Sequence, residues 1–456
     1  HGVVDLDHRH LQVQWPIRQH GRSPRCDRGR HELVTVALGH HGHEQLPGPD
    51  LAAVDRGAVE RAILTMETAV GRGSNLGRVQ SHQAILPQEP ARMADHTPAG
   101  RIRLVVLFGG RSAEHDVSCV TARHVLAAAD PERFDLVPVG ITRGGQWVQA
   151  AEALAALDRG AQALPDHVEA AGPAVEPFPV LRPADEPRTT VVLPLLHGPL
   201  GEDGTVQGLL DLADVPYVGS GVLGSAVAMD KAMAKQVTAA AGLPQCRHLV
   251  TTAGSADALF RRDVADQLGF PVFVKPANMG SSVGVSRATD DDELVSALEL
   301  ALSYDEIAVV EEAVDGREIE VAILGNADPQ ASVAGEIRSG GEFYDYEDKY
   351  HDGTAELLIP APLDDNEMAE VRALAVCSFQ ALRCAGMARV DFFYEQDGRG
   401  FLLNEINTIP GFTPISMYPK MWEASGLAYP DLIAELARLA IERHQQRQKH
   451  RRTSRD

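Results

Sequence analysis

Two predicted strands near the end of the chain carry residue types that can bind a cation and stabilise a negatively charged oxygen. Ala388–Tyr394 and Phe401–Asn407 are rich in β-forming residues, and the Asp397-Gly398 pair between them is typical of a hairpin. Side chains two apart on a strand share a face. A five-residue loop, Gln396–Gly400, would therefore bring polar side chains of both strands onto one face of the hairpin.

This face would hold two carboxylates, a carboxamide and a guanidinium. The loop sets Asp391 opposite Glu405 and Arg389 opposite Asn407. Oxygen ligands of this kind suit a hard divalent cation, above all Mg²⁺ carrying a nucleotide phosphate. The alternative is an ordinary charged face in contact with solvent. The tight loop that follows favours a site, because the backbone N–H of Gly411 could approach a substrate oxygen.

Composition and charge narrow the class of protein. The chain has 456 residues, enough for two or three domains, and its 44% hydrophobic and 23% charged residues are typical of a soluble globular protein. A net charge of −22 argues against nucleic acid as a partner, and no apolar run is long enough to cross a membrane. The five scattered cysteines include no CxxC pair, which favours a reducing cytoplasm.

Residues 1–100 are interpreted as an extension that is disordered or not natively expressed. Residues 1–92 contain half of the eighteen histidines, no lysine and little sustained hydrophobic periodicity. The hypothesis is that translation begins at Met93, and tryptic peptides from before Met93 would contradict it. A second interpretation of this segment is a zinc-binding tract, with the cluster His40, His41 and His43 as ligands.

Residues 101–224 are predicted to form an α/β domain that binds a substrate. Leu104–Phe108 reads as a strand that is followed by a Gly-Gly turn and a helix, the pattern of a βα unit. Glu114 lies in that turn, above the carboxyl end of the strand, where open α/β sheets bind ligands. His197 follows a second strand, Thr190–Leu196, in a Gly-rich loop, where a histidine can be a ligand contact or simply structural.

Residues 225–310 are predicted to form a second domain, which begins with a helix over Ala226–Ala241 and has a phosphate-binding turn. The strand Phe270–Pro276 carries Lys275 near its end, and a turn containing Ser281 and Ser282 follows it. Such a turn can fold over phosphates through its N–H groups and hydroxyls, with the lysine as a point charge. It is not a Walker A loop, and the alternative is an ordinary Gly/Ser hairpin.

Residues 311–444 are predicted to form a third domain, which contains the hairpin. Glu311 and Glu312 end a strand and could receive an adenine amino group and ribose hydroxyls, or could be a solvated edge. Gly341–Gly353 is rich in acids and aromatic residues, which predicts a lid that closes on substrate. Residues 445–456 are predicted to be a disordered basic tail.

In chain order, these motifs resemble those of the D-alanine–D-alanine ligases, which have the ATP-grasp fold. The resemblance covers about Arg101 to Ala440. It implies an α/β fold with α+β character, in which a Rossmann-like domain precedes two ATP-grasp subdomains. The motifs are GGRSAEHDVS, HGPLGEDGTVQG, MDKAMAK, VKPANMGSSVGV, VVEEAVDGRE, EFYDYEDKY, ARVDF and NEINTIPGF.

The resemblance also implies roles for residues at the matching positions. Nucleotide contacts are implied for Lys231, Lys275, Ser281, Ser282, Glu311, Glu312, Glu318, Lys349 and Asn404. Two Mg²⁺, with Mn²⁺ as an alternative, are implied at Asp391, Glu405 and Asn407. Substrate contacts and catalysis are implied for Glu114, His197, Ser281, Tyr350, Arg389, Gly411 and Ser416.

The implied reaction uses ATP to phosphorylate the first D-alanine, whose acyl phosphate is attacked by the amine of the second. Glu114 would bind the first ammonium, Arg389 and the Gly411 N–H would stabilise the oxyanion, and Ser416 would meet the second D-alanine. Tyr350 favours the dipeptide over D-alanyl-D-lactate. The implied setting is a cytoplasmic homodimer that supplies a peptidoglycan precursor.

Two further functions remain open from the sequence. Another ATP-grasp ligase with a different acceptor would share the nucleotide site, but Glu114 and Tyr350 match the D-alanine site. A nucleotide-binding regulatory protein that has lost catalysis would lack some of Lys275, Arg389 and the predicted metal ligands, and all of them are present.

Overall fold

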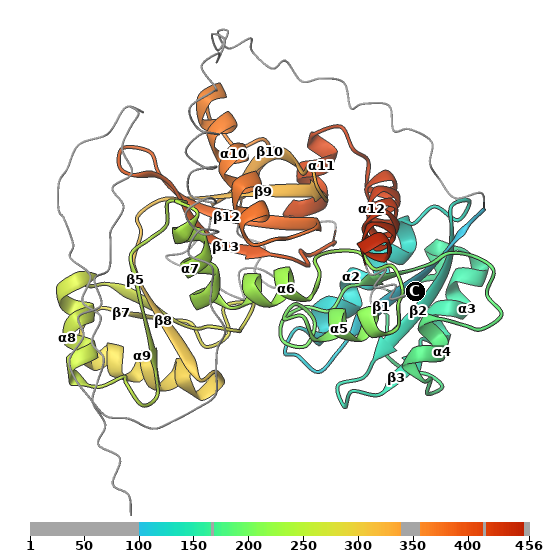
Figure 1. Ribbon diagram of the computed structural model, residues 1–456, viewed down its shortest axis with the longest axis horizontal. Helices are drawn as coiled ribbons and strands as arrows, with labels where there is room; N and C mark the ends of the chain where they lie inside the picture. The colour runs from blue at the N-terminus through green and yellow to red at the C-terminus, as the bar shows by residue number, and fades with distance from the viewer. Residues whose placement is uncertain (1–99, 166–167, 339–355, 414–415, 451–456) are drawn as a thin grey trace, which may run out of the picture. The chain divides into compact units, whose positions relative to one another are not determined.

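The computed structural model describes residues 100–165, 168–338, 356–413 and 416–450, and these residues contain three β-sheets with helices packed on them (Figure 1). The predicted N-terminal extension, the predicted lid at Gly341–Gly353, and with it Lys349 and Tyr350, lie outside the described residues. None of the described helices is both long enough and apolar enough to cross a membrane.

The first sheet has four strands in the order β3-β2-β1-β4, and β1 pairs in parallel with both of its neighbours. Every residue of β1 is buried, which explains the continuous apolar run Leu104–Phe108 within it, and Arg103 is its one charged residue. Its strands are β1 (Ile102–Gly109), β2 (Phe134–Ile141), β3 (Trp147–Gln149) and β4 (Thr190–Pro194). Its helices are α2 (His115–Ala128), α3 (Ala151–Arg159), η1 (Ala161–Ala163), α4 (Pro177–Leu181) and α5 (Thr205–Leu212).

Two short helices, α6 (Val222–Met229) and α7 (Lys231–Ala240), occupy the stretch in which the sequence predicts a single helix over Ala226–Ala241. Asp230 separates them, because its backbone is extended and its side chain accepts a 2.9 Å hydrogen bond from the N–H of Met233. Aspartate is a preferred N-cap, so a second helix begins there. Lys231 consequently stands in the first turn of α7.

The second sheet is antiparallel, with the strand order β5-β8-β6-β7. Asp290 caps α9 through a 2.9 Å bond from the N–H of Glu293, and the buried side of α9 packs on β6 and β7. The strands are β5 (His248–Thr252), β6 (Val272–Pro276), β7 (Ser286–Ala288) and β8 (Ile307–Glu312). The helices are α8 (Ala258–Gln267) and α9 (Asp291–Tyr304).

The third sheet has the strand order β11-β10-β9-β12-β13, and all of its pairs are antiparallel. Helices α10 and α11 pack on β9 and β10, where Val371, Ala375 and Phe379 of α10 are buried (Figure 1). The strands are β9 (Arg317–Gly325), β10 (Gln330–Arg338), β11 (Glu356–Leu358), β12 (Gly386–Glu395) and β13 (Gly400–Asn407). The helices are α10 (Asp365–Ala381), α11 (Met417–Ala424) and α12 (Tyr429–His450).

Helix α12 continues to His450, so the prediction of a disordered tail from Gln445 is wrong for residues 445–450. The sequence there is polar, but its side chains find partners on the first domain. Arg447 makes bonds of 2.5 and 2.6 Å to the carboxylate of Asp211. The polar composition of residues 445–450 therefore reflects a helix that contacts the first domain through Arg447.

Candidate active site

In the hairpin formed by β12 and β13, the end that contains Arg389 and Asn407 has the predicted strand pairing. The loop predicted to set this pairing is not what produces it. Asp391 pairs with Glu405 and Arg389 with Asn407, as the sequence predicts. The turn, however, leaves only Gln396–Arg399 unpaired, because Glu395 pairs with Gly400. The fifth unpaired residue is Asn404, which forms a bulge in β13, because Asp391 pairs with Glu405 and Phe392 pairs with Leu403.

The bulge has a chemical consequence. In a regular strand Asn404 and Glu405 would point to opposite faces, yet both of their side chains line the same cavity. Asn404 Oδ1 accepts a 3.3 Å hydrogen bond from Lys275 Nζ of the second sheet. The irregular residue of the hairpin therefore links the third sheet to the cavity-lining lysine of the second.

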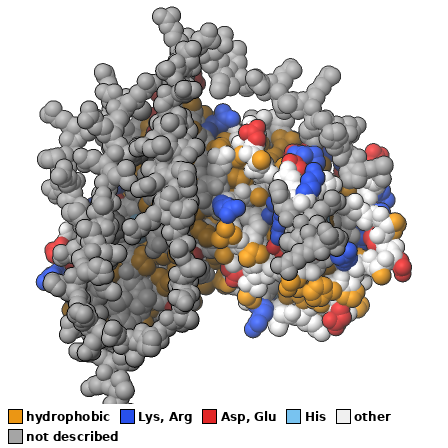
Figure 2. Space-filling view, viewed as in Figure 1, with side chains coloured by type: hydrophobic (Ala, Val, Ile, Leu, Met, Phe, Trp, Pro, Cys, Tyr) orange, Lys and Arg blue, Asp and Glu red, His pale blue; other side chains and the backbone are white. Residues whose placement is uncertain are grey.

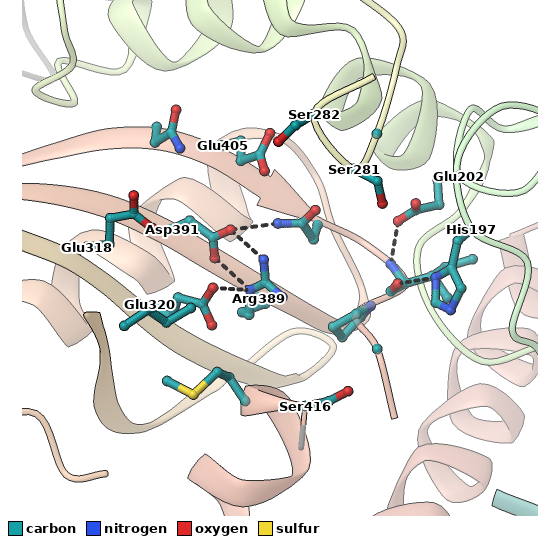
Figure 3. Close-up of a pocket in the computed structure, with 18 of the residues that line it drawn as sticks. His197, Glu202, Ser281, Ser282, Glu318, Glu320, Arg389, Asp391, Glu405 and Ser416 are labelled. Atoms are coloured by element: carbon teal, nitrogen blue, oxygen red, sulfur yellow. Dashed lines mark hydrogen bonds and ion pairs between the residues drawn. The ribbon is translucent and has the colours of Figure 1, made fainter. Parts of the chain in front are cut away.

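Three carboxylates lie side by side across β9, β12 and β13. Asp391 is the direct partner of Glu320 on one neighbouring strand and of Glu405 on the other. Like charges placed opposite each other on a sheet are destabilising, so this row requires a cation. Arg389 supplies one, because its Nε lies 3.1 Å from Glu320 and its Nε and Nη2 donate to Asp391 at 2.8 and 2.7 Å (Figure 3). Burial would lower the pKa of Arg389, but Asp391 and Glu320 outweigh it and raise the pKa well above its ordinary value.

Asp391, Glu405 and Asn407, the predicted metal ligands, share this end of the hairpin. Asn407 Nδ2 donates to Asp391 at 2.9 Å, so the carboxamide and the carboxylate are neighbours. Within the described residues, no three His, Cys, Asp or Glu side chains are gathered as a metal site. The predicted set contains only two such side chains and a carboxamide, and its oxygens are the donors that Mg²⁺ prefers. The residue types therefore fit a hard divalent cation.

A cavity of about 370 Å³ lies beside this hairpin and is lined by residues of all three domains. Most of the site residues predicted from the sequence line it, and several are drawn in Figure 3. They are Glu114, His197, Lys231, Lys275, Ser281, Ser282, Glu318, Arg389, Asp391, Asn404, Glu405, Asn407, Gly411 and Ser416.

Glu311 and Glu312, the other predicted nucleotide contacts, are not among the residues that line this cavity, and their contact with a nucleotide stays a prediction. Adjacent residues of a strand point to opposite faces, so the two carboxylates have different partners. Glu312 bonds Arg247 and Arg399 at 2.6 and 2.5 Å. Glu311 is 2% exposed and contacts two lysines, of which Lys275 lines the cavity.

Glu311 contacts two lysines and orients one of them, Lys275, which lines the cavity. Lys275 Nζ donates to its Oε2 at 2.7 Å, and Lys235 Nζ lies 2.9 Å from its Oε1. Burial alone would raise the pKa of Glu311, but the charges of Lys235 and Lys275 outweigh it and lower the pKa well below its ordinary value. The carboxylate is therefore ionised at neutral pH, and this group of three charges keeps one positive charge beside the cavity.

Lys231 is the second lysine of the cavity. Its Nζ donates to the carbonyl oxygen of Met279 at 2.7 Å and lies 3.9 Å from Glu405. Burial lowers the pKa of Lys231 below its ordinary value. Lys231 and Lys275 come from different elements, yet both point into the cavity beside the acidic hairpin.

Glu114 stands at the start of α2, and two glycines surround its carboxylate. A Cβ at Gly198 would meet Glu114 Oε2 at 2.5 Å, and one at Gly280 would meet it at 2.8 Å. The hydroxyl of Ser281 donates to Glu114 Oε1. Ser281 and Ser282 have φ of 49° and 59°, a left-handed backbone that is uncommon outside glycine and concentrates at functional sites. The turn after β6 thus bends back onto Glu114.

If Glu114 binds the D-alanine that the family resemblance implies, replacing Gly280 by alanine is expected to lower kcat/KM for that substrate by about tenfold to a hundredfold, because the added Cβ displaces the Glu114 carboxylate. Steady-state kinetics with a varied concentration of that substrate would measure this. Gly208→Ala in α5 is the control, since nothing lies within 4 Å of a Cβ there, and it should leave kcat/KM unchanged. An unchanged kcat/KM in Gly280→Ala would show that the close approach to Glu114 is unimportant.

Two further residues of the site, Glu320 and Glu202, were not predicted from the sequence. Glu320 orients Arg389, and its position two residues after Glu318 on β9 was the available signal, since both then share a face. Glu202 lines the cavity and bonds the N–H groups of Gly198 and Ile409. Burial and nearby Glu114 raise the pKa of Glu202 to about 8. Its partner Ile409 is too distant in sequence for any local pattern to reveal it.

Ser416 and Gly411 meet at the opposite side of the cavity. Ser416 Oγ accepts from the N–H of Thr413 at 3.0 Å and lies 2.8 Å from the Thr413 hydroxyl. A Cβ at Gly411 would approach Ser416 Oγ to 2.9 Å, so a side chain there would displace the Ser416 hydroxyl. A hydroxyl and a backbone N–H are thus presented together next to Arg389 and His197.

Comparisons with known proteins match most of the described part of the chain. The family models described as "D-ala D-ala ligase N-terminus" and "D-ala D-ala ligase C-terminus" match residues 103–220 and 237–438. The D-alanine--D-alanine ligase of Geobacillus thermodenitrificans is 45% identical over 364 residues, 76% of this chain and 98% of that protein. The same enzyme of Bacillus licheniformis is 46% identical over 361 residues, 77% of this chain and 99% of that protein.

Two solved structures are similar over the same region. The D-alanine-D-alanine ligase from Coxiella burnetii has a TM-score of 0.65 and 35% identity, and the match covers 77% of this chain and 97% of that one. The VanG D-Ala:D-Ser ligase from Enterococcus faecalis has a TM-score of 0.64 and 33% identity, with coverage of 75% and 99%.

Proposed function

The chain belongs to the D-alanine–D-alanine ligase family and has its ATP-grasp fold, and from this premise we propose that it uses ATP to join two D-alanines into the dipeptide for a peptidoglycan precursor. The observation that carries the proposal is the cavity, which combines a carboxylate for an ammonium group, Glu114, with two lysines and an acidic hairpin for a metal-bound nucleotide.

The residues that line the cavity are proposed to contact different parts of the substrates, according to their charge. Glu114, fixed by Ser281, binds the ammonium of the first D-alanine. Lys231 and Lys275 hold the phosphates of ATP, and Glu318 on β9 meets the ribose. Arg389 and the N–H of Gly411 face the oxygen that becomes negative when the amine of the second D-alanine attacks the acyl phosphate. Ser416 meets the second D-alanine.

Mg²⁺, or Mn²⁺ in its place, is proposed at Asp391, Glu405 and Asn407. The metal would neutralise phosphate charge, and the chain contributes two carboxylates and a carboxamide whose oxygens suit it. The row of three carboxylates supports this proposal, because the carboxylates outnumber the charges of Arg389 and Lys231 beside them. Titration with Mn²⁺ followed by electron paramagnetic resonance should detect binding in the intact chain and its loss in Glu405→Gln.

The acceptor is proposed to be D-alanine rather than D-serine or D-lactate. One similar structure carries the name of a D-Ala:D-Ser ligase, so D-serine is the alternative that the comparisons raise. Tyr350, on which the sequence argument for the dipeptide depends, lies outside the described residues. Competition between D-alanine and D-serine, with the products separated by chromatography, would decide between them.

We also propose a cytoplasmic homodimer without nucleic-acid or membrane partners. Relatedness to the family supports the dimer, and sedimentation velocity would test it. The net charge of −22 supports the absence of a nucleic-acid partner. On the described part of the face in Figure 2, basic and acidic side chains are interspersed rather than gathered into a basic stripe.

A further inference from the structure

We propose that Glu202 and His197 are positioning residues that fix the loop Asn407–Gly411 by holding both polar backbone atoms of Ile409. Glu202 Oε1 accepts a 3.0 Å hydrogen bond from the N–H of Ile409, and His197 Nδ1 donates a 3.1 Å bond to its carbonyl oxygen (Figure 3). The consequence for catalysis rests on the proposed function, in which the Gly411 N–H faces the reacting oxygen.

The backbone of this loop needs partners from elsewhere. Strand β13 ends at Asn407, so Ile409 has no strand neighbour to pair with. Ile409 is 3% exposed, and buried backbone N–H and C=O groups are costly when they lack a hydrogen bond. Pro410 follows, which has no N–H of its own to anchor the loop. Two side chains from the loop after β4 therefore supply the missing bonds.

Glu202 and His197 each have a second contact in addition to the one with Ile409. Glu202 Oε2 accepts a 2.9 Å bond from the N–H of Gly198, so one carboxylate spans both loops. His197 is 5% exposed, and its Nε2 lies 3.5 Å from the hydroxyl of Thr121 in α2. Both side chains therefore already have the positions that their bonds to Ile409 require.

Ile409 lies in the sequence between two residues of the proposed active site. Asn407, a proposed metal ligand, precedes Ile409 by two positions, and Gly411 follows it by two. The intervening Pro410 has a fixed φ, so a displacement of the Ile409 peptide is passed on to Gly411 rather than absorbed. A displacement of about 1 Å in an active-site group can lower a rate about a hundredfold. The same contact ties His197 and Glu202 of the first domain to the loop that follows the hairpin of the third.

Asp203, the next residue, provides a matched control. Its carboxylate also accepts two backbone bonds, from the N–H groups of Leu200 at 2.8 Å and Thr205 at 2.9 Å. Both of these partners belong to its own loop and to the start of α5. Asp203→Ala therefore removes a carboxylate with the same number of backbone bonds but leaves Ile409 untouched.

The test compares Glu202→Ala, Glu202→Gln and Asp203→Ala in the full chain by amide hydrogen exchange and by kinetics. Glu202→Ala is expected to speed exchange of the Ile409 amide by about tenfold, the loss of one hydrogen bond, and to lower kcat at least about tenfold while KM for ATP stays within about twofold. Glu202→Gln keeps one acceptor oxygen and should retain much of both properties. Asp203→Ala should change neither.

Exchange and kinetics separate the inference from the proposed function. The exchange of Ile409 does not require activity, so a chain without ligase activity still tests the contact. Unchanged exchange at Ile409 in Glu202→Ala would overturn the inference, as would faster exchange accompanied by an unchanged kcat. An equal loss of kcat in Asp203→Ala would also overturn it, because that loss would reflect general damage to the loop. If Glu202→Ala does not fold, Glu202→Asp carries the same comparison, because the shorter side chain withdraws its carboxylate from the N–H of Ile409. Faster exchange at Ile409 is then expected, and unchanged exchange would contradict the contact.

Discussion

Arg389→Lys is expected to lower kcat for D-alanine-dependent phosphate release by about 10²–10³-fold, while KM for ATP changes by no more than about twofold. Lysine keeps the positive charge, but it cannot reproduce the fork that bonds Asp391 with two nitrogens and Glu320 with one of them. The side chain at position 389 would therefore no longer be oriented toward the proposed oxyanion, whereas Lys231 and Lys275 would still bind the nucleotide. Phosphate release at saturating ATP and D-alanine measures kcat.

Arg399→Lys is the matched control for this prediction. Arg399 lies at the other end of the same hairpin, where it bonds Glu395 through two nitrogens and also contacts Glu312. It does not line the cavity, so its replacement should leave kcat within about twofold. A similar loss of kcat in both variants would mean that any weakened ion pair of the hairpin slows the enzyme, and a small loss in Arg389→Lys would remove Arg389 from the proposed oxyanion contact.

Lys235→Met is expected to lower the free energy of unfolding by about 3 kcal/mol, because it removes one partner of a buried carboxylate. The side chains of Lys235 and Glu311 are 4% and 3% exposed, and their charges are 2.9 Å apart. Glu311 has a depressed pKa, so its ionisation stabilises the fold above the ordinary value of 4.5 and this contribution is lost as the pH falls. The difference between Lys235→Met and the parent chain should therefore be full at pH 7 and shrink in acid. Urea unfolding at several pH values measures it.

Lys231→Met, one helical turn earlier in α7, should behave in the opposite way. Lys231 bonds a backbone carbonyl and points into the cavity, so its loss should weaken ATP binding and change the free energy of unfolding by about 1 kcal/mol or less. Equal destabilisation by the two variants would contradict the distinction between a nucleotide lysine and a structural one.

Side-chain alternation along strands predicted the chemically active face of the hairpin from the sequence. The pairs Asp391–Glu405 and Arg389–Asn407 are both present. The route to that register was wrong, because a bulge and not the turn contributes the odd residue. A bulge depends on how the strand packs in the whole sheet, and the sequence of the hairpin alone carries little sign of it.

The same alternation, applied to the end of β8, indicates that Glu311 and Glu312 have different surroundings, because consecutive residues of a strand face opposite sides. In the structure Glu312 contacts Arg247 and Arg399, and Glu311 contacts two lysines. These charged partners come from α7, β6, the segment just before β5 and the hairpin turn. Such tertiary contacts could not be predicted from the sequence of β8.

Contacts between distant segments were beyond the reach of the sequence. Glu202 lies in a loop whose glycines and acids are also typical of an ordinary turn, and its bond to Ile409 joins two domains. The break at Asp230 was visible in principle, since aspartate is a common N-cap, but a continuous helix was equally compatible with the hydrophobic pattern. Tertiary partners also extended α12 through a polar stretch that composition alone assigns to an unfolded tail.

The most direct test of the proposed function is the product formed from D-alanine, ATP and Mg²⁺ by the purified chain. We expect phosphate release with D-alanine alone, accompanied by D-alanyl-D-alanine on chromatography, and no release with L-alanine. Phosphate release that depends on D-serine or D-lactate would contradict the proposed acceptor. ATP binding without phosphate release under any of these conditions would contradict the account of the cavity as a ligase active site.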